Sequence, residues 1–134
     1  MISPAIHLPG TCNEAIEFYE KVFRATDKHI DYYRNAPMDP GFAVTEDIKD
    51  LVMHASLTIC KTPVNFSDSQ EIICAGNMIC LNVFFDSADE VSHAYHLLKE
   101  GGKVIVDLGP QFFSPMYGSV EDKYGVKWQL ISPA

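Results

Sequence analysis

The first residues that could do chemistry form a polar stripe on one strand-like run. His54, Ser56 and Thr58 alternate with apolar residues between positions 51 and 60, and successive side chains of a β-strand point to opposite faces of its sheet. The three polar side chains are therefore expected on one face. Since an imidazole can act as a base, a metal ligand or a hydrogen-bond partner, His54 is the candidate catalytic residue. Two interpretations stay open: contact with a ligand, and a purely structural hydrogen bond.

A second group of candidates is aromatic. Phe112, Phe113 and Tyr117 lie in one short run near the C-terminus. Aromatic rings bury much apolar surface, and tyrosine adds a polar hydroxyl. The run therefore either lines an apolar ligand pocket or closes the core at its edge.

The four cysteines contain no pair with two residues between them, and they lie at positions 12, 60, 74 and 80. We expect reduced and mostly buried thiols, because the chain shows no export signal. Cys80 has two interpretations, a thiolate ligand or a small buried hydrophobic residue.

Two helix-start signals organise the elements that must position these residues. Thr11 with Glu14 and Ser87 with Glu90 both match the capping box, a Ser or Thr followed three residues later by Glu, and they lie 76 residues apart. The same offset relates two apolar stripes, Ala15, Tyr19 and Val22 in one and Val91, Tyr95 and Leu98 in the other. It also relates the strand-like runs 5–8 and 81–84. The chain is therefore interpreted as an internal duplication.

Periodicity predicts helices over residues 12–24 and 88–100. Strands are predicted over residues 2–8, 28–33, 51–60, 63–67, 78–85, 103–108, 116–120 and 126–131. Residues 35–47, with Pro37, Pro40 and Gly41, are expected to form a loop. Each half then reads β-α-β-β-β, and one helix covers only one face of its sheet. We predict an α+β fold with two βαβββ modules, at about 1–68 and 76–134, whose curved mixed sheets enclose a shared cleft in a single domain.

Charge and hydropathy exclude some partners. The 134 residues carry a formal net charge of −8 without a basic cluster, so nucleic acid and anionic membranes are not expected as partners. No apolar stretch is long enough for a transmembrane helix, and the N-terminus lacks the pattern of a signal peptide. The expected location is cytoplasmic.

Several segments in the right order resemble a known superfamily. They are residues 14–19, 53–59, 67–68, 101–104, 117–118 and 122–128, and they resemble the vicinal oxygen chelate superfamily, which includes glyoxalase I, extradiol dioxygenases and fosfomycin-resistance proteins. The resemblance is to its PhnB-like branch. It implies paired βαβββ modules, a small-molecule ligand and a homodimer. Some members of that branch carry a demethylubiquinone methyltransferase label, but this chain has no glycine-rich strand-to-helix turn for a nucleotide-like cofactor.

The resemblance also implies where a metal would bind. Metal enzymes of the superfamily hold ligands on the first strand and a late strand of each module, which here pairs Pro4 with Cys80 and His54 with Gln129. Proline offers no side-chain ligand, and a glutamine amide is a weak one. His54, Cys80 and Gln129 therefore form an incomplete metal set, and a divalent metal ion is a candidate cofactor only. His7 is expected on the other face, away from this set.

Two functions follow. The leading one is a glyoxalase-like small-molecule-binding protein, a degenerate or metal-independent member of the superfamily. Its ligand would contact Ser56, Thr58, Phe112, Phe113, Tyr117 and Gln129. The alternative is a divalent-metal-dependent lyase, dioxygenase or drug-modifying enzyme that uses His54. The sequence leaves open whether the protein is an enzyme.

Overall fold

The computed structural model describes residues 1–36 and 43–133, in two compact units, Met1–Ile73 and Cys74–Ala134. Each unit is described by itself. Pro37, Pro40 and Gly41 of the predicted loop lie outside the described residues. Among the described residues, neither helix is long and apolar enough to cross a membrane.

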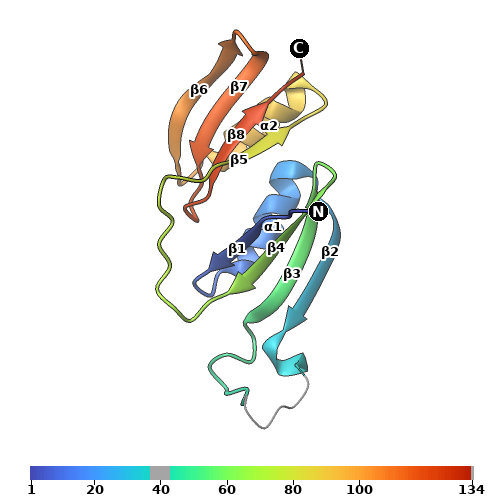
Figure 1. Cartoon of the computed structure of the whole chain (residues 1–134), viewed down its shortest axis with the longest axis vertical. Helices are drawn as coiled ribbons and strands as arrows, with labels where there is room; N and C mark the ends of the chain where they lie inside the picture. The colour runs from blue at the N-terminus through green and yellow to red at the C-terminus, as the bar shows by residue number, and fades with distance from the viewer. Residues whose placement is uncertain (37–42, 134) are drawn as a thin grey trace. The chain divides into compact units, whose positions relative to one another are not determined.

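The first unit is a four-stranded mixed sheet with one helix (Figure 1). In chain order its elements are β1 (Ala5–Leu8), α1 (Cys12–Phe23), β2 (Thr26–Tyr32), the short 3-10 helix η1 (Tyr33–Asn35), β3 (Val52–Ile59) and β4 (Thr62–Asp68). The strand order is β1-β4-β3-β2. β1 pairs parallel with β4, whereas the other pairs are antiparallel.

The second unit repeats this topology (Figure 1). Its elements are β5 (Leu81–Phe84), α2 (Ala88–Leu98), β6 (Lys103–Gln111), β7 (Ser114–Glu121) and β8 (Lys127–Ile131). The strand order is β5-β8-β7-β6, with a parallel pair between β5 and β8. The predicted α+β fold with two βαβββ modules is confirmed. Whether the modules at 1–68 and 76–134 form one domain stays a prediction.

The apolar stripes of both helices pack as predicted. Ala15, Tyr19 and Val22 are buried in the first unit, and the Tyr19 ring stacks on Phe66 with 5.7 Å between centroids. The stripe of α2, which is Val91, Tyr95 and Leu98, is also buried. Gly118 of β7 lies directly under α2, because a Cβ there would come within 2.8 Å of the Tyr95 ring. Each helix therefore covers one face of its own sheet.

Only one of the two predicted capping boxes forms. The Ser87 hydroxyl accepts a hydrogen bond from the Glu90 amide at 3.2 Å and donates to the Glu90 carboxylate at 3.0 Å. The prediction for Thr11 is wrong, because Thr11 makes no side-chain cap. Asp68 replaces it, and its carboxylate accepts from the backbone amides of Cys12 at 3.0 Å and Val52 at 2.9 Å. A carboxylate binds both N–H groups more strongly than a neutral hydroxyl would.

The 76-residue offset holds for the helices but not for the strand faces. Leu8 is 2% exposed, whereas Phe84, its partner at that offset, is 68% exposed. The buried residue that corresponds to Leu8 is Phe85, which directly follows β5 and lies 77 positions further along the chain. The extra residue lies in the turn before α1, where Gly10 adopts a φ of +86° that favours glycine.

Strand ends differ modestly from the prediction. β1 and β5, the first strands of the two units, begin later than predicted. β6 continues to Gln111, because its ladder with β7 extends to the pair Gln111 and Ser114. Phe112 and Phe113 thereby become the two-residue turn of a β6–β7 hairpin. The predicted β3–β4 and β7–β8 hairpins both form.

Candidate functional site

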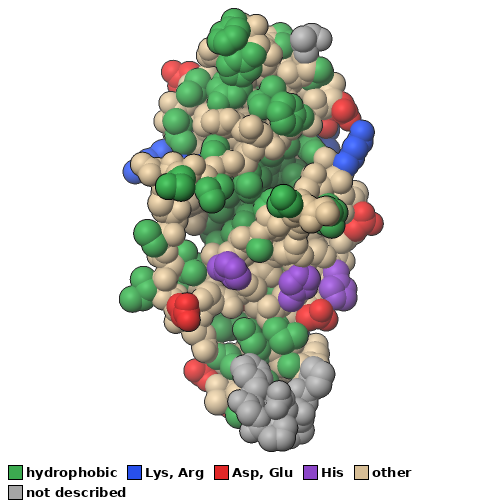
Figure 2. All heavy atoms as spheres, in the orientation of Figure 1, with side chains coloured by type: hydrophobic (Ala, Val, Ile, Leu, Met, Phe, Trp, Pro, Cys, Tyr) green, Lys and Arg blue, Asp and Glu red, His purple; other side chains and the backbone are tan. Residues whose placement is uncertain are grey.

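The predicted polar stripe lies on the face of the first sheet opposite its buried core residues, called here the first outer face. His54, Ser56 and Thr58 share this face, while Ala55 and Leu57 between them are buried. Neighbouring strands add further polar residues to it: Ser56 pairs with Asn65 and His29, and His54 pairs with Asp31. Figure 2 shows histidine side chains gathered over this unit.

Hydrogen bonds indicate the tautomer of a neutral His54 ring. Its Nε2 lies 2.9 Å from Oδ1 of Asn65. The Asn65 amide nitrogen donates to the Ser3 hydroxyl at 2.6 Å and to the Pro4 carbonyl at 3.4 Å, which fixes Oδ1 as the acceptor facing His54. Nε2 therefore carries the hydrogen in this contact, and the lone pair of a neutral ring is on Nδ1. Nδ1 is thus the atom at which His54 could accept a proton.

The prediction for His7 is wrong. His7 pairs with Ser67 in the parallel β1–β4 ladder, and its Nδ1 lies 2.7 Å from the Ser67 hydroxyl. Through that register His7 lies on the first outer face with His54. The 76-residue offset misplaced it because the offset does not hold for strand faces. His29 adds a third imidazole, paired with Asp31 at 3.0 Å.

The face of the second sheet that lies opposite α2 is called here the second outer face. Its side chains form three rows across the strands, one apolar, one polar and one charged. Cross-strand partners in a sheet share a face. The apolar row is Phe84, Ile131 and Tyr117, on β5, β8 and β7. The polar row beside it is Asn82, Gln129 and Ser119, and the charged row is Lys127, Glu121 and Lys103.

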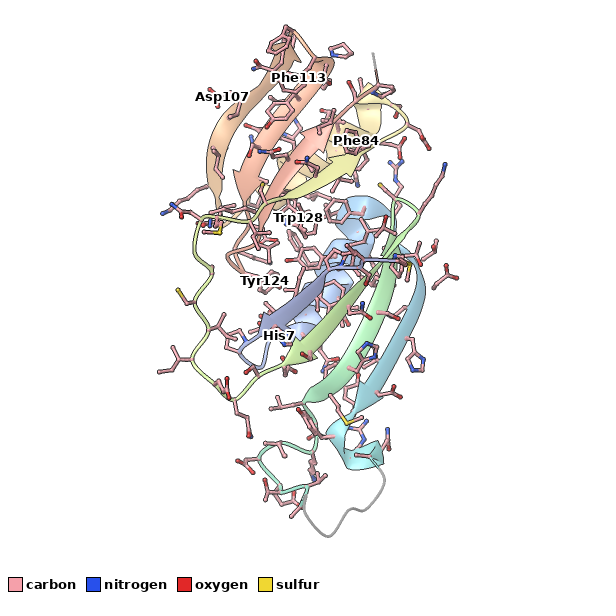
Figure 3. The ribbon with its side chains drawn as sticks, in the orientation of Figure 1. His7, Phe84, Asp107, Phe113, Tyr124 and Trp128 are labelled. Carbon is pink, nitrogen blue, oxygen red and sulfur yellow. The ribbon has the colours of Figure 1, made fainter. Side chains whose placement is uncertain are left out.

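The aromatic candidates of the second unit meet at one end of the apolar row. The rings of Phe113 and Tyr117 lie edge to face, with 5.0 Å between centroids and 82° between planes. Phe112 packs edge to face on Phe113 at 5.2 Å. Phe113, labelled in Figure 3, lies at the tip of the β6–β7 hairpin and is half exposed, whereas Tyr117 is buried.

Burial raises the pKa of two groups in this unit, Tyr117 and Cys80. Burial raises the pKa of the Tyr117 phenol, and the nearby Cys80 adds to the effect, while a hydrogen bond with Ser119 opposes it. Burial also raises the pKa of the Cys80 thiol, against the opposing influence of Lys127. At neutral pH Tyr117 is therefore a hydrogen-bond donor, and Cys80 is a thiol rather than the thiolate that metals prefer.

The metal set of His54, Cys80 and Gln129 stays a prediction, with His54 in the first unit and Cys80 and Gln129 in the second. Among the described residues there is no group of three His, Cys, Asp or Glu side chains that could hold a metal ion. The pairing of His54 with Gln129 as equivalent positions is wrong, because β3 corresponds to β7 in the strand order, and β8 corresponds to β4.

Some residues of these two faces were not predicted from the sequence. Asn65 alternates with the buried Val64 and Phe66, a period-two pattern that could have placed it beside His54. The row from Phe84 to Tyr117 has no such local signal, since it depends on the pairing of three strands.

Comparisons with known proteins agree with this fold. The family model described as 3-demethylubiquinone-9 3-methyltransferase matches residues 1–131. The crystal structure of protein PA1353 from Pseudomonas aeruginosa is similar, with 25% identity, a TM-score of 0.80, and 99% of this chain and 98% of that chain covered. A PhnB protein from Bacillus cereus has 26% identity and a TM-score of 0.73, with 98% of both chains covered.

A more distant likeness shows the fold alone. The fosfomycin resistance protein FosX from Listeria monocytogenes has 10% identity and a TM-score of 0.65, with 100% of this chain and 94% of that chain covered. No curated protein matches the chain.

Proposed function

Because the chain belongs to the 3-demethylubiquinone-9 3-methyltransferase family, and with it to the PhnB-like branch of the vicinal oxygen chelate superfamily, we propose that it binds a small amphipathic molecule on the second outer face. The observation that carries this proposal is the register that sets an apolar aromatic row directly beside a polar row. We propose no methyl transfer, since a βαβββ sheet lacks the strand-to-helix phosphate loop of a nucleotide-binding fold.

The side chains on this face suit a ligand with a ring and one polar group. Ligand sites are mostly apolar, with a few polar groups that fix orientation. The half-exposed Phe113 offers a ring surface beside the buried Tyr117, and the Gln129 amide can both donate and accept a hydrogen bond. The protonated Tyr117 hydroxyl would donate to an oxygen of the ligand. In this arrangement the ring lies over the apolar row and the polar group over the polar row.

On the first outer face, we keep the proposal that a ligand contacts His54, Ser56 and Thr58. His54 would act through Nδ1, as a hydrogen-bond acceptor or a general base, because Nε2 is engaged by Asn65. The donor set gives no support to a metal held by His54, Cys80 and Gln129. The proposal is therefore a metal-independent protein, and the metal-dependent enzyme is its competitor.

A titration with 2-naphthol tests the binding site, because this probe joins a planar ring to one hydroxyl. We expect saturable changes in the amide NMR shifts of residues 113, 117 and 129. Phe113→Ala should weaken the affinity about 3- to 10-fold, the loss typical of one aromatic contact. Ile72→Ala is the matched control, since Ile72 is a fully exposed apolar residue of the first unit. Shifts that do not map to this face, or equal affinity for the Phe113 variant, would contradict the proposal.

We also propose that the protein is a cytoplasmic homodimer. The edge strand β6 exposes two neighbouring apolar side chains, Val104 and Ile105, which support an interface, because exposed apolar surface marks interaction sites. Sedimentation equilibrium at micromolar concentration should give twice the 15.0 kDa chain mass. A monomer throughout that range would rule the dimer out.

A further inference from the structure

The tip of the β6–β7 hairpin presents two aromatic rings that are exposed or half exposed. Phe112 is fully exposed and Phe113 is 49% exposed, although both side chains are large and apolar. A fully exposed ring such as that of Phe112 gains nothing from the hydrophobic effect. Apolar burial alone therefore does not explain the position of the tip.

The turn itself does not hold the hairpin. Two-residue hairpin turns favour types I′ and II′, which need a positive φ at the first turn residue, because these match the twist of the strands. The β3–β4 turn follows this rule, with φ of 45° at Cys60 and 72° at Lys61. Neither Phe112 nor Phe113 has a positive φ. The β6–β7 turn is thus of a kind that would splay its strands unless other contacts held them.

Two buried serines, Ser114 and Ser132, anchor the β7 side of this turn to the segment that directly follows β8. Ser114 is 2% exposed and Ser132 is 3% exposed. The Ser114 hydroxyl lies 2.9 Å from the carbonyl oxygens of Met116 and Ser132, to which it can donate, and accepts from the Ser132 amide at 3.2 Å. The Ser132 hydroxyl accepts from the Met116 amide at 3.1 Å. Buried hydroxyls that are fully hydrogen-bonded in this way fix backbone geometry.

We propose that Ser114 and Ser132 form a clamp that positions the Phe112–Phe113 turn, so that the Phe113 ring stands against Tyr117 and forms one wall of the ligand site. Both serines are positioning residues, since neither reaches the face where the ligand would bind. The proposal rests on the proposed function for its ligand, a molecule that carries an apolar ring. It assigns the selectivity for that ring to the geometry of the hairpin base.

A double-mutant cycle with 2-naphthol tests the clamp. Ser114→Ala should weaken the affinity about 3- to 10-fold in the wild-type background but less than about twofold in Phe113→Ala, because both changes remove the same wall. Ser92→Ala on α2 is the matched control and should leave the affinity unchanged. A serine with only a structural role would lower the melting temperature without this coupling. Additive effects of the two substitutions would overturn the proposal.

A second measurement needs no ligand. Ring-to-ring nuclear Overhauser effects between Phe113 and Tyr117 should be strong in the wild type and lost in Ser114→Ala, or in Ser132→Ala where the first variant fails to fold. Unchanged ring contacts in a folded variant would overturn the clamp even where 2-naphthol does not bind. Weaker binding by Phe113→Ala with full affinity in Ser114→Ala would overturn the clamp and leave the proposed function standing.

Discussion

At the scale of single residues, the ion pair that closes the charged row should make stability depend on pH. The Lys127 ammonium lies 2.8 Å from a Glu121 oxygen, and this contact holds the pKa of the Glu121 carboxyl below its ordinary value of 4.5. A carboxylate whose pKa is lowered by folding stabilises the folded state when it is ionised. That contribution is complete above the unfolded value and is lost as the pH falls through the folded value.

Glu121→Gln tests this dependence. The wild type should exceed the variant in free energy of unfolding by a constant amount between pH 6 and 8, and the difference should shrink below about pH 4.5, where the unfolded carboxyl becomes protonated. Urea unfolding at a series of pH values measures it. Glu46→Gln is the control, because its pair with Lys49 is strongly exposed and such pairs stabilise little. A difference in free energy of unfolding that grows toward acid pH would contradict the expected stabilisation by the ionised Glu121.

Residue-scale reasoning from the sequence succeeded where the signal was local. The alternation around His54 predicted its face, because one strand fixes the direction of its own side chains. The cap of α1 could not be predicted, since Asp68 comes from a strand 56 positions away and displaces the nearer Thr11. Its two accepted hydrogen bonds depend on the packing of β4 beside β1.

At the scale of elements, the β3–β4 turn contains residues that disfavour its backbone conformation. Cys60 and Lys61 both adopt the left-handed conformation, which disfavours residues with a Cβ by about 1 kcal/mol each. The turn type matches the strand twist, but its residues are not the Asn and Gly that it prefers. The pairing of β3 with β4, on which the His54 to Asn65 contact depends, overrides that local preference.

Lys61→Gly should therefore stabilise the protein by about 0.5–1 kcal/mol, since glycine adopts the positive φ without steric cost. Thr62→Gly is the matched comparison and should destabilise it, because Thr62 lies within β4 and glycine weakens a strand. Urea unfolding of the three proteins checks both signs. A Lys61→Gly protein less stable than the wild type would contradict the account of this turn.

The elements themselves were largely predictable, but their correspondence was not. Both helices and all eight strands follow from apolar periodicity, because period and capping are local properties of the chain. The offset of 76 residues misassigned the faces of β1 and β5, since one extra turn residue near Gly10 shifts the register. It also paired His54 with Gln129, because a spacing along the chain does not record the order of strands in a sheet.

At the scale of the whole molecule, the fold matches the family, but the fold alone does not determine what the site binds. Two βαβββ units reproduce the architecture of the family, whereas the described residues of neither unit gather the ligands for a metal. What the second unit does gather is an apolar row beside a polar row, with Phe113 set against Tyr117. One scaffold can host several chemistries, so the site has to be argued from its own side chains. The central proposal is that this apolar and polar surface binds its ligand without a metal.

The most direct test is the affinity for 2-naphthol of protein freed of metal by chelator, compared with the same protein after Mn²⁺ is added in excess. The account predicts equal dissociation constants and the same amide shifts at residues 113, 117 and 129 in both samples. Binding that appears only with Mn²⁺, and that His54→Ala abolishes, would contradict it.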